Sequence, residues 1–142
     1  MSGSGTGNLS LIADKDIQVN AALQNLSGEG DLTLSSKTGV AINSGGSIDW
    51  DGGSGGLISI TGGLSGEGSI AINSGTLVIN IADESTGTVF GGTITGNESS
   101  RLSKSGAGTL VLSGSSSYSG ITSIDGGNLT ITGVPNLSLI HI

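Results

Sequence analysis

The stretch Leu26-Ser-Gly-Glu-Gly-Asp-Leu-Thr-Leu34 recurs, little changed, as Leu64-Ser-Gly-Glu-Gly-Ser-Ile-Ala-Ile72. A looser copy, Lys104-Ser-Gly-Ala-Gly-Thr-Leu-Val-Leu112, follows at a similar interval. The stretch Ala41-Ile-Asn-Ser-Gly45 also returns without change as Ala71-Ile-Asn-Ser-Gly75. Self-similarity at intervals of about 20 to 50 residues is the signature of an array of similar structural units. The chain is therefore predicted to be a repeat protein.

Inside and between these copies, apolar side chains alternate with other residues. Pairs of apolar residues spaced i and i+2 are Leu9/Leu11, Ile17/Val19, Leu32/Leu34, Val40/Ile42, Ile48/Trp50, Ile58/Ile60, Ile70/Ile72, Leu77/Ile79, Leu110/Leu112 and Leu129/Ile131. A period of two places alternate side chains on the same face of a β-strand. Clusters of Gly, Ser, Asn and Asp, which favour turns, separate the pairs. The sequence thus predicts an all-β protein.

Two all-β architectures suit short strands that are joined without long crossover helices. An antiparallel sandwich or barrel favours hairpin dipeptides, but Asn-Gly is absent and Asp-Gly occurs only at Asp51 and Asp125. In a parallel β-solenoid each turn of the chain stacks on the previous one, so the same apolar positions recur. The offset between successive copies would then correspond to two rungs of about 20 residues each, giving about seven rungs in all. The solenoid is the favoured architecture.

The composition supports this architecture and excludes several functions. Gly accounts for 28 of the 142 residues, and 37 are Ile, Leu or Val, whereas Trp, Tyr and Phe occur once each. A narrow interior of stacked aliphatic side chains needs few aromatic residues. The formal charge of −7, with only 4 Lys and Arg, argues against binding to nucleic acid. The chain has no Cys and no apolar run that suggests insertion into a membrane.

The second half of the chain resembles a known family. Ser105-Gly-Ala-Gly-Thr-Leu-Val-Leu-Ser-Gly114, Ser117-Tyr-Ser-Gly120 and Ile124-Asp-Gly-Gly-Asn-Leu-Thr-Ile131 together resemble the autotransporter-associated β-strand repeat, over residues 91–133. Residues 8–90 are more loosely similar to filamentous-haemagglutinin-type adhesin repeats, as in Gly7-Asn-Leu-Ser-Leu-Ile-Ala-Asp14. Both resemblances imply a right-handed parallel β-helix that type V secretion exports to a Gram-negative cell surface or to the medium. Such a passenger has neighbouring rungs and host-surface glycans or proteins as expected partners.

The two ends depart from the repeat pattern. Residues 1–7 have the composition of a flexible leader or a junction, and they lack the features of a secretion signal. Residues 8–133 are expected to form a single solenoid. Residues 134–142 leave the pattern after Pro135 and are expected to be a terminal strand, a cap or a truncation tail.

The most unusual local feature is the only tryptophan, Trp50, which stands between Asp49 and Asp51. An exposed indole could stack on a sugar ring while the two carboxylates bind its hydroxyl groups. The alternative is that Trp50 is the last inward residue of a strand, with Asp49 solvated and Asp51 beginning a turn. The structural alternative is favoured, and Asp49, Trp50 and Asp51 are kept as a speculative ligand contact.

No other group of residues predicts chemistry. The carboxylate pairs Asp14/Asp16 and Asp83/Glu84 are isolated, whereas calcium-binding solenoids repeat their acidic loops in tandem. The only His, His141, lies next to the end of the sequence, so no base is placed to activate a serine. No catalytic residue, metal ligand or cofactor is therefore predicted. Asn20, Asn43, Asn73 and Asn80 each follow a pair of apolar residues, where an amide can bond to the next rung.

The expected function is that of a non-enzymatic stalk segment in the passenger of a surface-exposed or secreted bacterial adhesin. Binding loops are expected at Asp83–Val89 and Glu98–Ser105, where the short spacing of strands lapses. The alternative is a fragment of a carbohydrate-active β-helix, such as a polysaccharide lyase or a glycosidase, whose catalytic rungs lie elsewhere. A cleft with two facing carboxylates would favour that enzyme.

Overall fold

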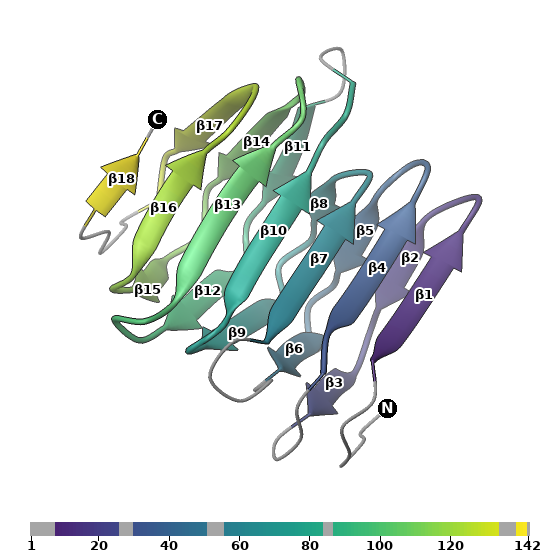
Figure 1. Ribbon diagram of the computed structural model, residues 1–142. Helices are drawn as coiled ribbons and strands as arrows, with labels where there is room; N and C mark the ends of the chain where they lie inside the picture. The colour runs from purple at the N-terminus through teal and green to yellow at the C-terminus, as the bar shows by residue number, and fades with distance from the viewer. Residues whose placement is uncertain (1–7, 26–29, 51–55, 84–86, 134–138, 142) are drawn as a thin grey trace.

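The computed structural model describes residues 8–25, 30–50, 56–83, 87–133 and 139–141. These residues form a right-handed parallel β-helix in which every strand pairs with the strand one turn away (Figure 1). The largest sheet has seven strands. They are β1 (Leu9–Ala13), β4 (Leu32–Ser36), β7 (Leu57–Thr61), β10 (Thr76–Asn80), β13 (Arg101–Ser105), β16 (Ile121–Ile124) and β18 (Leu139–His141). The predicted fold class is therefore confirmed.

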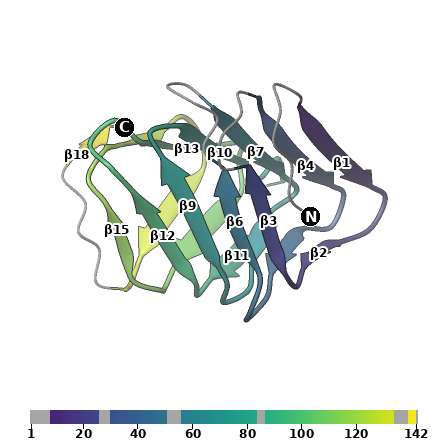
Figure 2. The same cartoon turned by 90° about the horizontal axis from the view of Figure 1, so that it is seen from below.

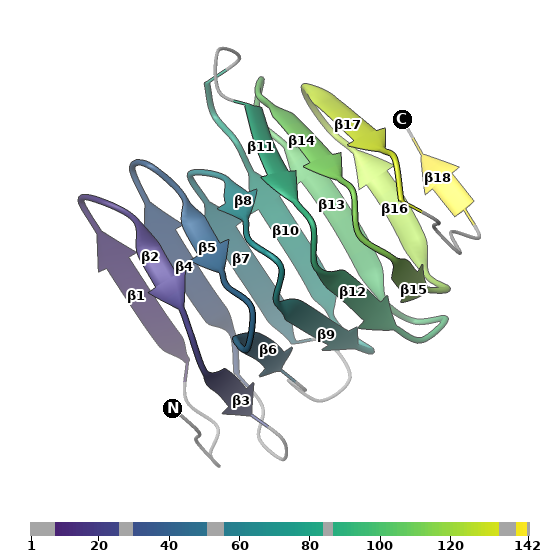
Figure 3. The same cartoon turned by 180° about the vertical axis from the view of Figure 1, so that it is seen from behind.

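Two further faces close the coil. The second face is a five-stranded sheet, which is seen from below in Figure 2. Its strands are β3 (Ala22–Asn25), β6 (Ser47–Trp50), β9 (Ser69–Asn73), β12 (Thr93–Gly96) and β15 (Ser116–Tyr118). The third face consists of two three-stranded sheets, which are seen from behind in Figure 3. They contain β2 (Ile17–Val19), β5 (Val40–Ile42) and β8 (Leu64–Ser65), and then β11 (Gly87–Phe90), β14 (Thr109–Leu112) and β17 (Asn128–Ile131).

The third face is interrupted because β8 is only two residues long. A single parallel bridge, between Gly66 and Phe90, links its two halves. The Thr88 hydroxyl provides a further link, since it accepts a hydrogen bond of 3.3 Å from the Leu64 backbone N–H.

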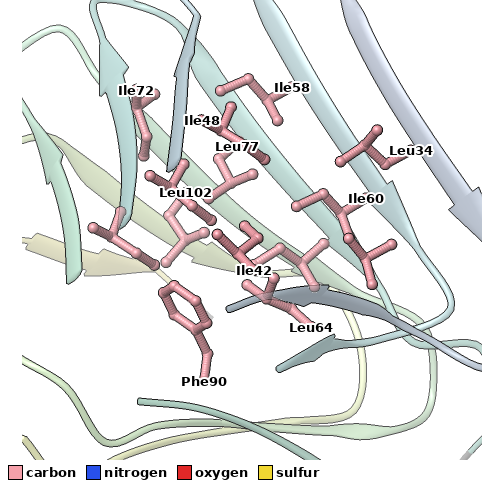
Figure 4. Packing of buried hydrophobic residues seen from close by; sticks show 14 of the residues in the cluster. Leu34, Ile42, Ile48, Ile58, Ile60, Leu64, Ile72, Leu77, Phe90 and Leu102 are labelled. Atoms are coloured by element: carbon pink, nitrogen blue, oxygen red, sulfur yellow. The ribbon is translucent and has the colours of Figure 1, made fainter. Parts of the chain in front are cut away.

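The interior is a stack of aliphatic ladders. All ten predicted apolar pairs lie in strands, and their side chains point into the coil. Figure 4 shows this packing for a part of the buried cluster that includes Leu34, Ile60, Leu77 and Phe90. Leu34, Ile60 and Leu77 are completely buried, whereas Leu9 and Leu11 on the first strand are only partly buried. A rung in the middle of the stack is covered on both sides, and the first described rung is covered on one side.

The number and length of the rungs differ from the prediction. The described residues form five complete three-stranded rungs, followed by β16, β17 and β18. One interior ladder runs through Leu11, Leu34, Ile60, Ile79, Lys104 and Ile124. Its longest turn is the one from Leu34 to Ile60, and its shortest is the next one, from Ile60 to Ile79. Because the corners vary in length while the strands stay in register, the constant period taken from the sequence overestimates the number of turns.

The three similar stretches also do not stack on one another, contrary to the prediction. The paired apolar residues that close each stretch, Leu32/Leu34, Ile70/Ile72 and Leu110/Leu112, lie in β4, β9 and β14, which belong to three different faces. What the stretches share is a glycine just before a strand. At Gly68 an added Cβ atom would lie 2.4 Å from the Ile42 side chain and 2.5 Å from the Gly46 carbonyl oxygen. The repeated stretch is thus a signal for the start of a strand, and it can occur on any of the three faces. The interval from Leu110 to Leu129, in contrast, is a true rung, since these residues are register partners.

Candidate functional site

The predicted ligand contact around Trp50 lies at the end of β6, where the chain leaves the five-stranded sheet. The Trp50 side chain is 5% exposed, and its indole N–H donates a hydrogen bond of 3.0 Å to the Gly30 carbonyl oxygen. The ring therefore packs inside the coil, as the structural interpretation of this residue expected. Asp49 points outward and accepts a hydrogen bond of 3.0 Å from the Asn73 side-chain amide. Asp51 lies outside the described residues.

The amide at position 73 belongs to a series of links between successive rungs. The Asn43 side-chain amide donates to the Asn20 side-chain oxygen at 2.7 Å, and Asn97 donates to the Ser74 hydroxyl at 2.9 Å. Asn73 itself has a φ of 57°, which is the left-handed conformation expected for an Asn after a strand. Asn side chains therefore connect neighbouring rungs at the corners, as the sequence predicted for Asn20, Asn43 and Asn73.

Three other acidic residues bind nearby groups. Asp14 forms an ion pair of 2.7 Å with Lys37, and both side chains are well exposed. Asp16 accepts a hydrogen bond from Gln18, which holds the pKa of that carboxyl below its usual value. Asp125 accepts hydrogen bonds from Ser103 and Ser123, and its pKa is lowered for the same reason. Among the described residues, no three His, Asp or Glu side chains come close enough to hold a metal ion.

A shallow cavity of about 480 Å³ opens at the corner between the seven-stranded sheet and the third face. Its lining includes Thr61 and Gly62, where the chain leaves β7, together with Lys37 and Asp83. Asp83 is the single carboxylate among its described lining residues. Hydroxyl groups of Ser36, Thr38 and Thr61 account for most of its other polar side chains.

Of the two predicted binding loops, Glu98–Ser105 is corrected by the structure. Its second half is strand β13, which pairs with β10 and β16. In the other, residues 84–86 lie outside the described part and β11 begins at Gly87. The search for apolar residues at positions i and i+2 missed β13 because one of its two inward residues is a lysine.

That residue, Lys104, is the least expected feature of the interior. It is completely buried between Ile79 below and Ile124 above in the same ladder. Its ammonium group donates hydrogen bonds to the carbonyl oxygens of Ser105, Gly106 and Gly126 at 2.8, 3.1 and 3.2 Å. Burial lowers the pKa of this ammonium group from its usual value, because the charged form loses its hydration.

A second buried polar contact closes the corner between β15 and β16. The hydroxyl groups of Tyr118 and Thr122 lie 2.5 Å apart, and both side chains are completely buried. Burial raises the pKa of the Tyr118 phenol, and the hydrogen bond to Thr122 opposes that shift. The Tyr-x-Gly element at Tyr118–Gly120 therefore forms a corner. The tyrosine side chain fills the interior, and the absence of a side chain at Gly120 lets the backbone pass close to the Ser100 carbonyl oxygen of the previous turn.

The geometry defines the class of protein: a repeat protein of the parallel β-solenoid type, with an aliphatic interior and short polar corners. Comparison with known families makes the assignment more specific. Residues 102–131 match the family model of the passenger-associated-transport-repeat. This match begins in β13 and ends with β17, so it covers one turn, including Lys104 and Tyr118, and the first two strands of the next turn. The predicted resemblance to an autotransporter passenger repeat is thereby confirmed.

No curated protein and no solved structure matches the chain. No helix in the described part of the chain has the length and the hydropathy that a membrane crossing requires. A passenger repeat on a β-solenoid fits the stalk of an autotransporter passenger, which is a surface-exposed or secreted part of such proteins.

Proposed function

We propose that this chain is a structural stalk segment in the passenger of a bacterial surface-exposed or secreted adhesin, and that it does no chemistry itself. The observation that carries the proposal is the continuous seven-stranded parallel sheet, two of whose strands, β13 and β16, lie in the region that matches the passenger-associated-transport-repeat. Each rung adds about 4.8 Å to the length of the coil. The stacked rungs therefore give the chain length and stiffness, whereas the corners between strands can differ in length and sequence.

The haemagglutinin-like character of residues 8–90 is part of the same proposal. These residues use the same three faces as the matched repeat, but their turns are less regular, since they include both the longest turn of the ladder, from Leu34 to Ile60, and the shortest, from Ile60 to Ile79. Adhesion would then depend on corner segments that project from the rod. Asp49 and Asp51 remain the proposed contact with a host glycan or protein, whereas Trp50, the third residue of the predicted contact, packs inside the coil.

A display experiment tests the stalk function. The chain would be placed between an epitope tag and an autotransporter translocator in a Gram-negative host, with a chain of the same composition in shuffled order as the control. We expect the native order to hold the tag outside the cell, where antibodies and added protease reach it. A tag that is exposed equally by the shuffled chain would contradict the proposal.

Binding is tested separately on a glycan array with the folded chain and with the variant Asp49→Asn. Loss of a glycan signal in the variant would support adhesion through this contact. A chain that binds no glycan would be a pure stalk. The carbohydrate-active alternative predicts cleavage or elimination of a bound polysaccharide, which reducing-end and unsaturated-product assays would detect.

A further inference from the structure

Lys104 stands where every neighbouring rung has an aliphatic residue. In the same ladder, Leu34, Ile60 and Ile79 precede it and Ile124 follows it. A lysine can fill such a position with its four methylene groups, but its ammonium group must then find partners inside the protein. Its complete burial therefore has to be explained by what surrounds Nζ.

Three backbone carbonyl oxygens surround Nζ, and they come from two successive corners. Ser105 ends β13 and Gly106 begins the corner after it, whereas Gly126 lies in the corner after β16, one rung further on. Three donors of an ammonium group thus meet three acceptors, at distances of 2.8 to 3.2 Å. Within the described residues, no carboxylate forms an ion pair with Lys104. The site compensates the cation with backbone dipoles alone.

We propose that these three carbonyl oxygens form a primary-ammonium-binding site, which the chain fills with its own Lys104 and which locks the corner of one rung onto the corner of the next. The site selects a group with three N–H donors on a straight alkyl chain. It therefore differs from a hydrophobic ladder position, which would accept any aliphatic side chain of similar volume. This inference does not depend on the proposed stalk function.

Chemical rescue tests the proposal. Lys104→Ala removes three methylene groups and the ammonium group, which n-propylammonium can replace. We expect propylammonium chloride to raise the melting temperature of this variant in a saturable manner. We expect it to bind at least about tenfold more tightly than n-propanol, since charge-assisted hydrogen bonds are stronger than neutral ones. Tetramethylammonium, which is a cation without N–H donors, should give no rescue.

A matched control is Ile79→Ala, which opens a cavity at the same position of the ladder, one rung earlier. Neutral n-propanol should stabilise that variant better than propylammonium does. The proposal is overturned if propanol stabilises folded Lys104→Ala to the same extent as propylammonium does. It is also overturned if the ratio of the two affinities, propylammonium to propanol, is the same for Lys104→Ala and Ile79→Ala.

A second measurement decides the matter where Lys104→Ala does not fold. In the wild-type chain, the ¹⁵Nζ-attached protons of Lys104 should exchange with water at least about tenfold more slowly than those of Lys15 and Lys37, because the site must open before exchange occurs. Lys15 and Lys37 are exposed. Exchange at Lys104 as fast as at these two residues would refute the site.

Discussion

The hydrogen bond between Tyr118 and Thr122 gives the sharpest prediction of stability. These residues lie on either side of the corner that joins β15 to β16, and their hydroxyl oxygens are 2.5 Å apart. Both side chains are completely buried, so water cannot replace either partner. Tyr118→Phe removes one hydroxyl group and leaves the ring in place.

The expected loss follows from the partner that remains. A buried hydroxyl group without a hydrogen bond costs about 1–3 kcal/mol. Tyr118→Phe and Thr122→Val should each lower the free energy of unfolding by that amount, because each leaves the other hydroxyl unsatisfied. The double variant removes both polar groups and should be less destabilised than the sum of the two single changes by about 1–3 kcal/mol.

Urea unfolding followed by circular dichroism measures these differences. With a slope of about 1–3 kcal/mol per molar urea, a loss of about 2 kcal/mol moves the midpoint by about 1 M. Tyr118 is the only tyrosine in the chain, so its absorbance also reports its own ionisation. Its pKa is raised, so the folded protein should ionise above the usual value of 10.0, and stability should fall as the pH rises above that value.

The reasoning fails if Tyr118→Phe costs less than about 0.5 kcal/mol, or if the effects of the two single changes simply add in the double variant. Either result would mean that the contact contributes nothing beyond the packing of the ring. An unchanged alkaline dependence in Tyr118→Phe would likewise assign that dependence to another group.

Three further predictions concern a corner, the ladder and the buried cation. Gly120→Ala should prevent folding or cost at least about 3 kcal/mol, because the new Cβ would lie 1.7 Å from the Ser100 carbonyl oxygen; a normal melting temperature would contradict this. Ile60→Ala should cost about 2–5 kcal/mol and Leu11→Ala clearly less, since Ile60 is fully buried and Leu11 only partly; equal losses in urea unfolding would refute the ladder argument. The pKa of Lys104 is lowered in the folded protein, so at pH values between that pKa and 10.5 the unfolded chain binds more protons than the folded chain. The free energy of unfolding should therefore rise with pH in this range. Lys104→Met should abolish the rise, which is measured by urea unfolding at pH values on both sides of the folded pKa.

The fold class was predictable because strand alternation is a local property. Each pair such as Leu32/Leu34 has the period of a strand, and its burial follows once the faces close. The strands that the pattern missed have fewer apolar residues, as in Ser116–Tyr118 and Arg101–Ser105. Their neighbours on both sides hold them in register, which is tertiary information that a single stretch does not contain.

The candidate site was less predictable, because exposure depends on the neighbouring rungs. Trp50 and Asp49 are adjacent in sequence and point in opposite directions, so the pattern alone allowed either one to face a ligand. Lys104 gave no signal of its own, since lysine is almost never fully buried. Its position two residues after Leu102, in the phase of the strand, was the one indication that its side chain points inward.

The variable corners explain both the failure of the predicted period and the suitability of the fold for a passenger. The turn from Leu34 to Ile60 is longer than the turn from Ile60 to Ile79, yet both belong to one ladder, so the additional residues are accommodated outside the strands. A change in a corner therefore leaves the interior ladder intact, provided that glycine remains at the positions where the backbone of the neighbouring turn comes too close for a Cβ atom. In this architecture rigidity comes from the ladder and diversity from the corners, so a stalk can acquire binding loops without redesigning its core. Binding activity should accordingly be sought first at the long corners of the first four rungs, while Lys104 and Tyr118 hold the more regular turn of the matched repeat.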